Sequence, residues 1–137
     1  MSLGTPKNNI LNRAVQQLVD MGVPVVVAAG NSDSNACRFS PSSAQGAFVV
    51  GALDDRLDTA ATFTNWGECV DAFASGVNVE SISIFNNSPV KYSGTSVSSP
   101  IAAGLIAYFM GMGDSGEVAT QRVSKLISII LSRLGPN

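Results

Sequence analysis

The stretch "VPVVVAAGN", residues 23–31, determines the fold class that the sequence predicts. Its apolar residues run on without alternation, which is typical of a strand covered on both faces in a parallel sheet. Residues 10–21 come before it with apolar side chains at helical spacing, and Gly22 ends that helix. The segments "AFVVGAL", residues 47–53, and "CVDAF", residues 69–73, predict two further strands. The first half of the chain therefore alternates between helix and strand.

The second half continues this alternation. Residues 77–85 keep a strand pattern, and residues 96–112 predict a helix that is apolar almost all round and therefore central and buried. A last helix is expected over residues 118–134, with Gly135 and Pro136 as its stop signal. We read residues 1–137 as one α/β unit with a mostly parallel sheet and flanking helices. The residues expected to face the core from the first and last helices are Ile10, Leu11, Ala14, Val15, Leu18, Val19, Val123, Leu126, Ile127, Ile130 and Leu134.

Composition excludes several classes of partner. Of the 137 residues 45% are hydrophobic, which is enough for a real core, while 13% are charged and the net charge is −2. Nothing in this balance indicates binding to nucleic acid or to an anionic membrane. The longest uncharged apolar run, residues 100–112, is too short to cross a bilayer. The first residues lack a signal-peptide pattern, so the chain itself does not state a compartment.

Ser96, in "SGTSVSSP", is the first candidate for chemistry. A serine at the start of a helix is more often a capping residue. The same position places the positive end of the helix dipole beside the hydroxyl, which suits a nucleophile that develops negative charge. A nucleophilic serine needs a base, and the chain contains no histidine. Lys91 is the nearest cation, and its polar turn predicts that it is exposed.

Asn31, which follows the first predicted strand, is the second candidate. A Gly-Asn pair after a strand is commonly only a turn. However, ligands bind at the carboxyl ends of parallel strands, and an asparagine amide there can donate a hydrogen bond to an oxyanion. A doubly wound nucleotide-binding domain also fits this pattern, but the chain lacks a glycine-rich phosphate loop.

Five segments together carry a resemblance to a known family. The segments "MSLG", "VVVAAGN", "RFSPSSAQGAFVVGA", "FTNWGECVDAFASG" and "SGTSVSSPIAAGLIAYFM" follow one another as in the C-terminal half of subtilisin-like serine proteases of the proteinase K branch. The resemblance implies a subtilisin-like fold and peptide-bond hydrolysis through an acyl-enzyme. It makes Ser96 the nucleophile and Asn31 the oxyanion donor. The residues that it implies for holding a peptide or protein substrate are Leu3, Gly4, Ala28, Ala29 and Gly30.

The family's catalytic aspartate and histidine lie upstream of the segment that matches "MSLG". We therefore expect the unit to be incomplete, with the N-terminal part of the same domain as its partner and with no activity in the isolated chain. The alternative is a truncated or degenerate subtilase-like protein that acts only by binding.

Cys37 and Cys69 lie in loop-like settings, and the residues alone favour neither a disulfide nor two free thiols. The resemblance favours the disulfide, because some proteinase K-like enzymes link the corresponding positions. A disulfide would in turn imply an extracellular, secretory or vacuolar location.

The resemblance also implies a structural calcium ion, although the chemistry itself requires no cofactor. In this reading the ligands are the Asp71 carboxylate and backbone carbonyls near Gln45 and Ala47. Hard oxygen ligands of this kind suit calcium. Judged from its residues alone, a single aspartate in a strand is more often solvated or hydrogen-bonded.

Overall fold

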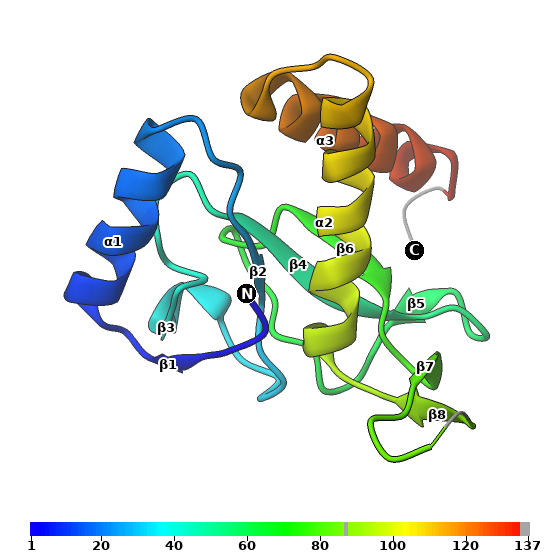
Figure 1. The fold of residues 1–137 in the computed structure, drawn as a ribbon. Coiled ribbons are helices and arrows are strands. Elements are labelled where there is room, and N and C mark those ends of the chain that lie inside the picture. The colour runs from blue at the N-terminus through cyan, green and yellow to red at the C-terminus, as the bar shows by residue number, and fades with distance from the viewer. Residues whose placement is uncertain (87, 135–137) are drawn as a thin grey trace.

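The computed structural model describes residues 1–86 and 88–134, with side chains described through residue 126. The helices lie near the two ends of the chain, and six strands follow one another between residues 39 and 92, so among the described residues the regular alternation of helix and strand expected from the sequence is absent there (Figure 1). In chain order the elements are β1 (Thr5–Pro6), α1 (Asn9–Asp20), β2 (Val26–Ala28), η1 (Ala36–Arg38), β3 (Phe39–Ser40), β4 (Phe48–Asp54), β5 (Thr59–Ala60), β6 (Ala72–Ser75), β7 (Val79–Ile82), β8 (Pro89–Tyr92), α2 (Thr95–Gly111) and α3 (Gly116–Leu134).

Strand β4 is the centre of the main sheet. It pairs in parallel with β2, where Val27 lies opposite Val49, and in parallel with β6, where Gly51 lies opposite Phe73. The short strand β5 adds to it in the antiparallel direction. Strand β4 is buried along almost its whole length, as its continuous apolar sequence predicts. The mostly parallel sheet expected from the sequence is confirmed.

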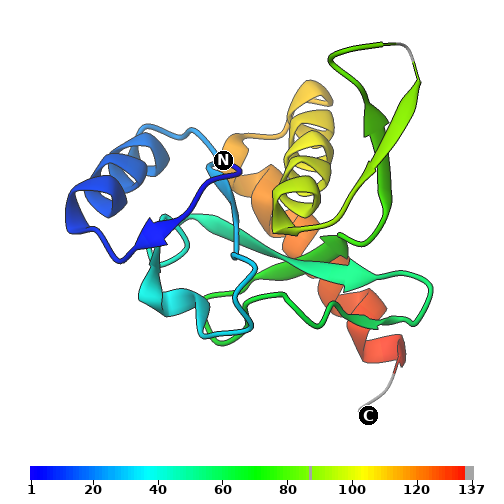
Figure 2. The same cartoon turned by 90° about the horizontal axis from the view of Figure 1, so that it is seen from below.

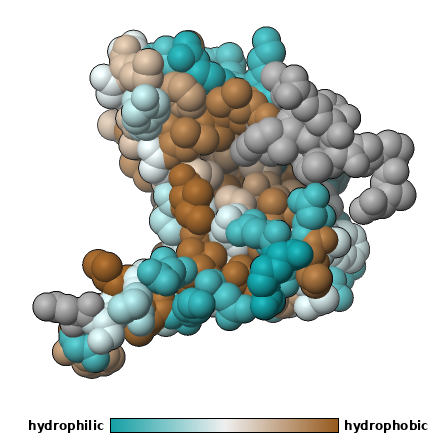
Figure 3. Space-filling view, turned by 90° about the vertical axis from the view of Figure 1, so that its right-hand side faces the viewer, coloured by the Kyte–Doolittle hydropathy of each residue, from teal (hydrophilic) through white to brown (hydrophobic). Residues whose placement is uncertain are grey.

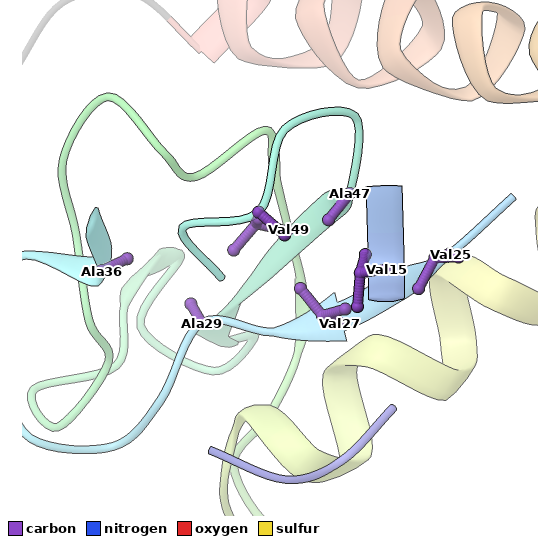
Figure 4. Close-up of a cluster of buried hydrophobic side chains, with 8 residues drawn as sticks. Val15, Val25, Val27, Ala29, Ala36, Ala47 and Val49 are labelled. Carbon is purple, nitrogen blue, oxygen red and sulfur yellow. The ribbon is translucent and has the colours of Figure 1, made fainter. Parts of the chain in front are cut away.

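Helices cover both faces of this sheet (Figures 1 and 2). On one face, Val15 of α1 packs in a cluster with Val25, Val27 and Val49, part of which Figure 4 shows. On the other face, residues of α2 and α3, among them Ile106, pack against alternate residues of the same strands. Burying one such aliphatic side chain stabilises the folded state by about 1.5–3 kcal/mol. Because side chains alternate along each strand, the two clusters fix which face of β2 meets each helix.

The strands differ from the sequence prediction in extent and in partner. Residues 23–25 lie outside β2, and the third strand begins at Ala72 rather than at Cys69, where a disulfide holds the chain. Residues 79–82 form β7, which pairs with β8 in a separate antiparallel hairpin and does not enter the main sheet. Ile82 in this hairpin is 87% exposed. An apolar strand pattern therefore did not identify the partner of this strand.

The expectation that residues 96–112 form a fully buried helix is wrong for one side of α2. Its sheet-facing side is buried, but its other side exposes four apolar residues, and Figure 3 shows apolar surface gathered in the middle of the right-hand face. Small residues such as Ala102 allow α2 to pack closely on the sheet beside Ile106, whereas most of the other large apolar residues of the helix are exposed. The exposed large residues of α2 are Ile101, Leu105, Tyr108 and Met110, and Met112 directly after the helix is also exposed.

The core residues predicted on the other helices are only partly confirmed. In α1, Val15 is buried while Ile10, Ala14 and Leu18 are exposed, because a single helical face meets the sheet. In α3, Val123 is buried and Leu126 is 42% exposed. The remaining predictions lie outside the residues whose side chains are described: Ile127, Ile130, Leu134, Gly135 and Pro136.

A disulfide joins Cys37 to Cys69, which confirms the pairing that the resemblance implied. It links the loop after β2 to the segment before β6, with a Cα–Cα distance of 5.4 Å and a sequence separation of 32 residues. In the chain-entropy model, closing a loop of this length stabilises the fold by about 3–4 kcal/mol. Within the part of the chain that the structure describes, no helix is both long and apolar enough to span a membrane.

Candidate active site

Ser96 lies in the first turn of α2 with its side chain exposed. The residue before the helix, Gly94, has a φ of 145°, which an L side chain rarely adopts. Glycine at this position therefore allows the chain to turn sharply into the helix. The 17-residue helix directs the positive end of its dipole at the Ser96 region.

The backbone of Ser96 is held by a bond from outside the helix. Pro100 has no N–H, so it cannot bond to the Ser96 carbonyl one turn earlier. The Ser2 hydroxyl donates to that carbonyl at 2.8 Å. It also lies 3.2 Å from the Ser99 hydroxyl. The proline therefore leaves a carbonyl that fixes the N-terminal segment against the start of α2.

The side chain of Asn31 is held in one orientation. Its Oδ1 accepts hydrogen bonds from the Thr95 N–H at 2.8 Å and from the Thr95 hydroxyl at 2.9 Å. Only the amide oxygen can accept from an N–H, so the Nδ2 donor must point the other way. A Cβ atom placed on Gly94 would lie 3.1 Å from Asn31 Nδ2 and 3.2 Å from Ser96 Oγ. The donor and the hydroxyl thus converge on one small space that a side chain at Gly94 would fill.

A buried asparagine, Asn65, fixes the loop that carries Asn31. Its Oδ1 accepts from the N–H groups of Ser32 at 2.9 Å and Ser34 at 3.2 Å, and its Nδ2 donates to the Ala29 carbonyl at 2.8 Å. These bonds hold the backbone on both sides of Asn31. A Cβ on Gly30 would come within 2.3 Å of Asn65 Nδ2, so only glycine fits there.

A cavity of about 290 Å³ lies beside these residues. It brings together all seven residues predicted for catalysis and substrate binding, namely Leu3, Gly4, Ala28, Ala29, Gly30, Asn31 and Ser96. The other lining residues are Ser2, Thr5, Pro6, Ser32, Phe39, Ser42, Asn65 and Thr95. None of the described residues that line the cavity is charged, so it suits uncharged groups.

The site brings a serine hydroxyl and an asparagine amide together, and no histidine is available to act as a base. The chain has no histidine, and Lys91 is exposed and lies opposite Glu80 in the β7–β8 hairpin, as its polar turn predicts. A lysine that serves as a base is normally buried beside the nucleophile, and Lys91 is exposed in a separate hairpin. This arrangement can hold a carbonyl group beside Ser96, but it lacks a group that accepts the hydroxyl proton.

Asp71, the residue expected to bind calcium, borders a different cavity of about 450 Å³. Its Oδ2 accepts from the Val49 N–H at 2.7 Å. Packing around the carboxylate raises the pKa of Asp71, and the Val49 bond opposes that rise, although the residue as a whole is exposed. Ala47 and Lys125 also line this cavity, whereas Gln45 does not. Among the described residues no cluster of three acidic, histidine or cysteine side chains surrounds it, so a cation would rely on backbone carbonyls.

Sequence reasoning missed three residues of this site. Ser2, Thr95 and Asn65 all act through hydrogen bonds to residues far away in the sequence. A motif shows only local spacing, so the signals were the position of Thr95 next to Ser96 and the positions of Ser2 within "MSLG" and of Asn65 within "FTNWGECVDAFASG". None of these positions shows which distant groups the side chain will bond.

Comparisons with known proteins agree on one family. A sequence model of the subtilase family matches residues 1–128. The chain is 42% identical over 127 residues to the subtilase-type proteinase RRT12 of Saccharomyces cerevisiae, covering 92% of this chain and 26% of that protein. It is 45% identical over 130 residues to subtilisin-like protease 2 of Pseudogymnoascus destructans, covering 94% and 32%. It is also 46% identical over 116 residues to cerevisin of S. cerevisiae, covering 82% and 18%.

The fold agrees with the sequence comparison. A crystal structure of a cold-adapted subtilisin-like serine proteinase superposes with a TM-score of 0.82 and 34% identity, and the match covers 88% of this chain and 44% of that one. The chain thus spans about a quarter to a third of the first two relatives and under half of this solved structure.

The Asn65 network leads to a test of stability. We expect Asn65→Ala to lower the free energy of unfolding by about 2–4 kcal/mol, because it removes a buried side chain and leaves the buried Ala29 carbonyl and two partly buried N–H groups without this partner. Urea denaturation would measure the loss, and hydrogen exchange should quicken at the Ser32 and Ser34 amides. Asn9→Ala, at an exposed position, is the matched control. Equal losses in the two variants would show that Asn65 does not hold the loop.

Proposed function

The chain belongs to the subtilase family, and from this premise we propose that it forms the part of a serine endopeptidase that carries the nucleophile and the oxyanion donor. One observation carries the proposal: Asn31 Nδ2 and Ser96 Oγ converge on the same space beside Gly94. The family makes serine-protease chemistry the general expectation, and this geometry is what that chemistry requires.

In the proposed mechanism the Ser96 oxygen attacks the carbonyl carbon of a peptide bond while a base takes the hydroxyl proton. The carbonyl oxygen becomes an oxyanion, and Asn31 Nδ2 donates a hydrogen bond to it. The C–N bond then breaks, the amine leaves with the proton, and water hydrolyses the acyl-serine. Thr95 keeps the Asn31 amide turned so that its donor faces the oxyanion.

The substrate would lie in the uncharged cavity beside Ser96. Leu3 and Gly4 on one side and residues 28–30 on the other offer backbone groups to an extended peptide. A peptide residue inserted there meets polar and apolar side chains but no charged one. We propose a peptide or protein as the substrate, with an uncharged side chain next to the cleaved bond.

The base and its orienting carboxylate must come from residues outside this chain, because no histidine is present. We propose that the missing part of a subtilase domain supplies them. The absence of histidine also leaves one alternative function, in which the chain binds peptides without cleaving them.

We place the protein in an extracellular, secretory or vacuolar compartment. The Cys37–Cys69 disulfide supports this proposal, because such bonds persist in oxidising environments.

We also propose that a calcium ion binds near Asp71. The Asp71 carboxylate and the backbone at Ala47 border one cavity, and carboxylate and carbonyl oxygens are the ligands that calcium prefers. A bound cation would favour the ionised carboxylate, which local packing disfavours. The proposed role is structural, since the site is distinct from the cavity beside Ser96.

The isolated chain should not turn over a chromogenic peptide, because the Ser96 hydroxyl has no base. Joining the upstream part of the cerevisin catalytic domain before Met1 should restore turnover and labelling by a fluorophosphonate. Ser96→Ala in the same chimaera is the control and should abolish both. Turnover by the isolated chain that Ser96→Ala removes would contradict the missing base. A folded chimaera that binds peptide without cleaving it would favour the binding function.

In that chimaera, Asn31→Ala should lower kcat far more than it changes KM, because the donor acts chiefly in the transition state. The expected loss is about 10²–10³-fold, a magnitude taken from subtilisin. Asn31→Asp keeps an oxygen for Thr95 but replaces the donor, so its loss should be at least as large. An unchanged kcat in both variants would mean that Asn31 only shapes the turn.

Calcium should raise the Tm of the chain but not that of Asp71→Asn, as measured by thermal unfolding with and without the ion. The effect should grow as pH rises through the pKa of Asp71, because only the ionised carboxylate binds the cation and folding has raised that pKa. Asp55→Asn, at an exposed position, is the matched control and should respond like the unmodified chain. The calcium assignment fails if the ion changes the Tm of neither the unmodified chain nor the two variants.

A further inference from the structure

The hydroxyl of Ser2 joins the N-terminal segment to the first turn of α2. It donates to the Ser96 carbonyl at 2.8 Å and lies 3.2 Å from the Ser99 hydroxyl. A serine hydroxyl has one proton and a carbonyl can only accept, so the Ser99 hydroxyl must donate in the second bond. Ser99 is buried, which keeps its hydroxyl in place. Two directed bonds therefore tie Ser2 to the turn that carries the candidate nucleophile.

Pro100 leaves the Ser96 carbonyl available for this contact. A carbonyl in a helix normally accepts from the N–H four positions later, and Pro100 has no N–H. The Ser2 hydroxyl supplies the missing donor. Because the acceptor belongs to the backbone of Ser96 itself, any movement of Ser2 relative to α2 is also a movement relative to the nucleophile.

The next two residues, Leu3 and Gly4, form one wall of the cavity beside Ser96. Leu3 is 51% exposed, and a Cβ atom placed on Gly4 would meet no atom within 4 Å. Their backbones make no hydrogen bond to any other described residue, because pairing with β3 begins at Thr5. The backbone of the Leu3–Gly4 wall is thus bonded only at its two ends, and Ser2 is the end that contacts α2.

We propose that Ser2 is a positioning residue, whose bond to the Ser96 carbonyl fixes the distance between the Leu3–Gly4 wall and the nucleophile. A peptide that lies along this wall then presents its carbonyl group to Ser96. The inference rests on the proposed function and deepens it, because it predicts how the reaction depends on substrate length. Only a substrate with several residues before the cleaved bond can reach along the wall, so only such a substrate gains from Ser2.

The oxyanion donor does not depend on this contact. The Asn31 amide is held by Thr95, and neither of its two bonds passes through Ser2. The proton of the Ser2 hydroxyl is already donated to the Ser96 carbonyl, so the proposed role requires no bond from Ser2 to the substrate. Loss of this hydroxyl should therefore impair substrate alignment and leave the reactivity of Ser96 intact.

The first arm of the test uses the chimaera with the upstream part of the cerevisin domain and two substrates that share one leaving group, acetyl-Leu-p-nitroanilide and acetyl-Ala-Ala-Ala-Leu-p-nitroanilide. Ser2→Ala should lower kcat/KM for the longer substrate about five- to tenfold, the size expected for one lost hydrogen bond, and change the shorter one by no more than about twofold. Ser2→Thr keeps a hydroxyl and should restore the ratio between the two substrates.

Two controls accompany this arm. Ser88→Ala removes a hydroxyl at an exposed position outside the cavity and should leave both substrates unaffected. Labelling by a fluorophosphonate reports on Ser96 without a peptide, and its rate should be the same in Ser2→Ala as in the unmodified chimaera. A variant that is misfolded would instead lose labelling together with both substrates.

The second arm needs no activity. In the isotopically labelled chain of 137 residues, Ser2→Ala should lower the backbone order parameter of Gly4 towards about 0.6, the value of flexible backbone, as measured by ¹⁵N relaxation. The order parameter of Val97 in the first turn of α2 should stay near about 0.85. Ser2→Thr should keep both values, and Ser88→Ala is again the matched control.

Either of two results would overturn the proposal. One is an active chimaera in which Ser2→Ala affects the short and the long substrate equally, or affects neither. The other is an unchanged order parameter of Gly4 in Ser2→Ala. A chimaera with Ser2 intact that neither cleaves nor is labelled would contradict the catalytic proposal instead, and the relaxation measurement would then decide the role of Ser2 by itself.

Discussion

The site depends on one interaction, the pair of hydrogen bonds from Thr95 to the Asn31 carboxamide oxygen. These bonds join the loop after β2 to the first turn of α2, two segments that are 64 residues apart in sequence. They do two things at once. They fix how far the end of the strand lies from the start of the helix, and they decide which end of the Asn31 amide faces Ser96. The orientation of the Asn31 amide is therefore set by a contact between the loop after β2 and the first turn of α2.

Much of the architecture could be predicted because it depends on local apolar pattern. The continuous apolar run of β4 indicates burial on both faces, and β4 is the central strand. The pattern failed where the partner was not local. Residues 79–82 are apolar enough for the main sheet, yet they pair with Pro89–Tyr92 in a separate hairpin, because register depends on contacts that no single segment shows.

The residues of the candidate site also fall into two groups, those that a local motif predicts and those that depend on tertiary contacts. Ser96 and Asn31 could be named because a glycine-rich approach to a helix and the end of a buried strand are visible in short motifs. The role of Asn65 could not be predicted, although its side chain makes three hydrogen bonds to the loop backbone around Asn31. The partners of a buried polar side chain become neighbours only after the chain has folded. Groups that react can be read from short motifs, whereas those that hold them in place depend on the tertiary fold.

Helix α2 shows the same limit of prediction from local pattern, because its sequence is apolar almost all round although only one of its faces packs on the sheet. One face of the helix packs on the sheet through Ala102 and Ile106, while Leu105 and Tyr108 on another face remain exposed. Exposing large apolar residues is unfavourable, and a surface patch of this kind marks a contact with another segment. Because Ser96 lies in the first turn of this helix, whatever covers α2 approaches the nucleophile. The buried contacts of α2 with the sheet hold Ser96 beside Asn31 without any residue on the exposed face of the helix, so the candidate site is positioned by the sheet-facing side of α2 alone.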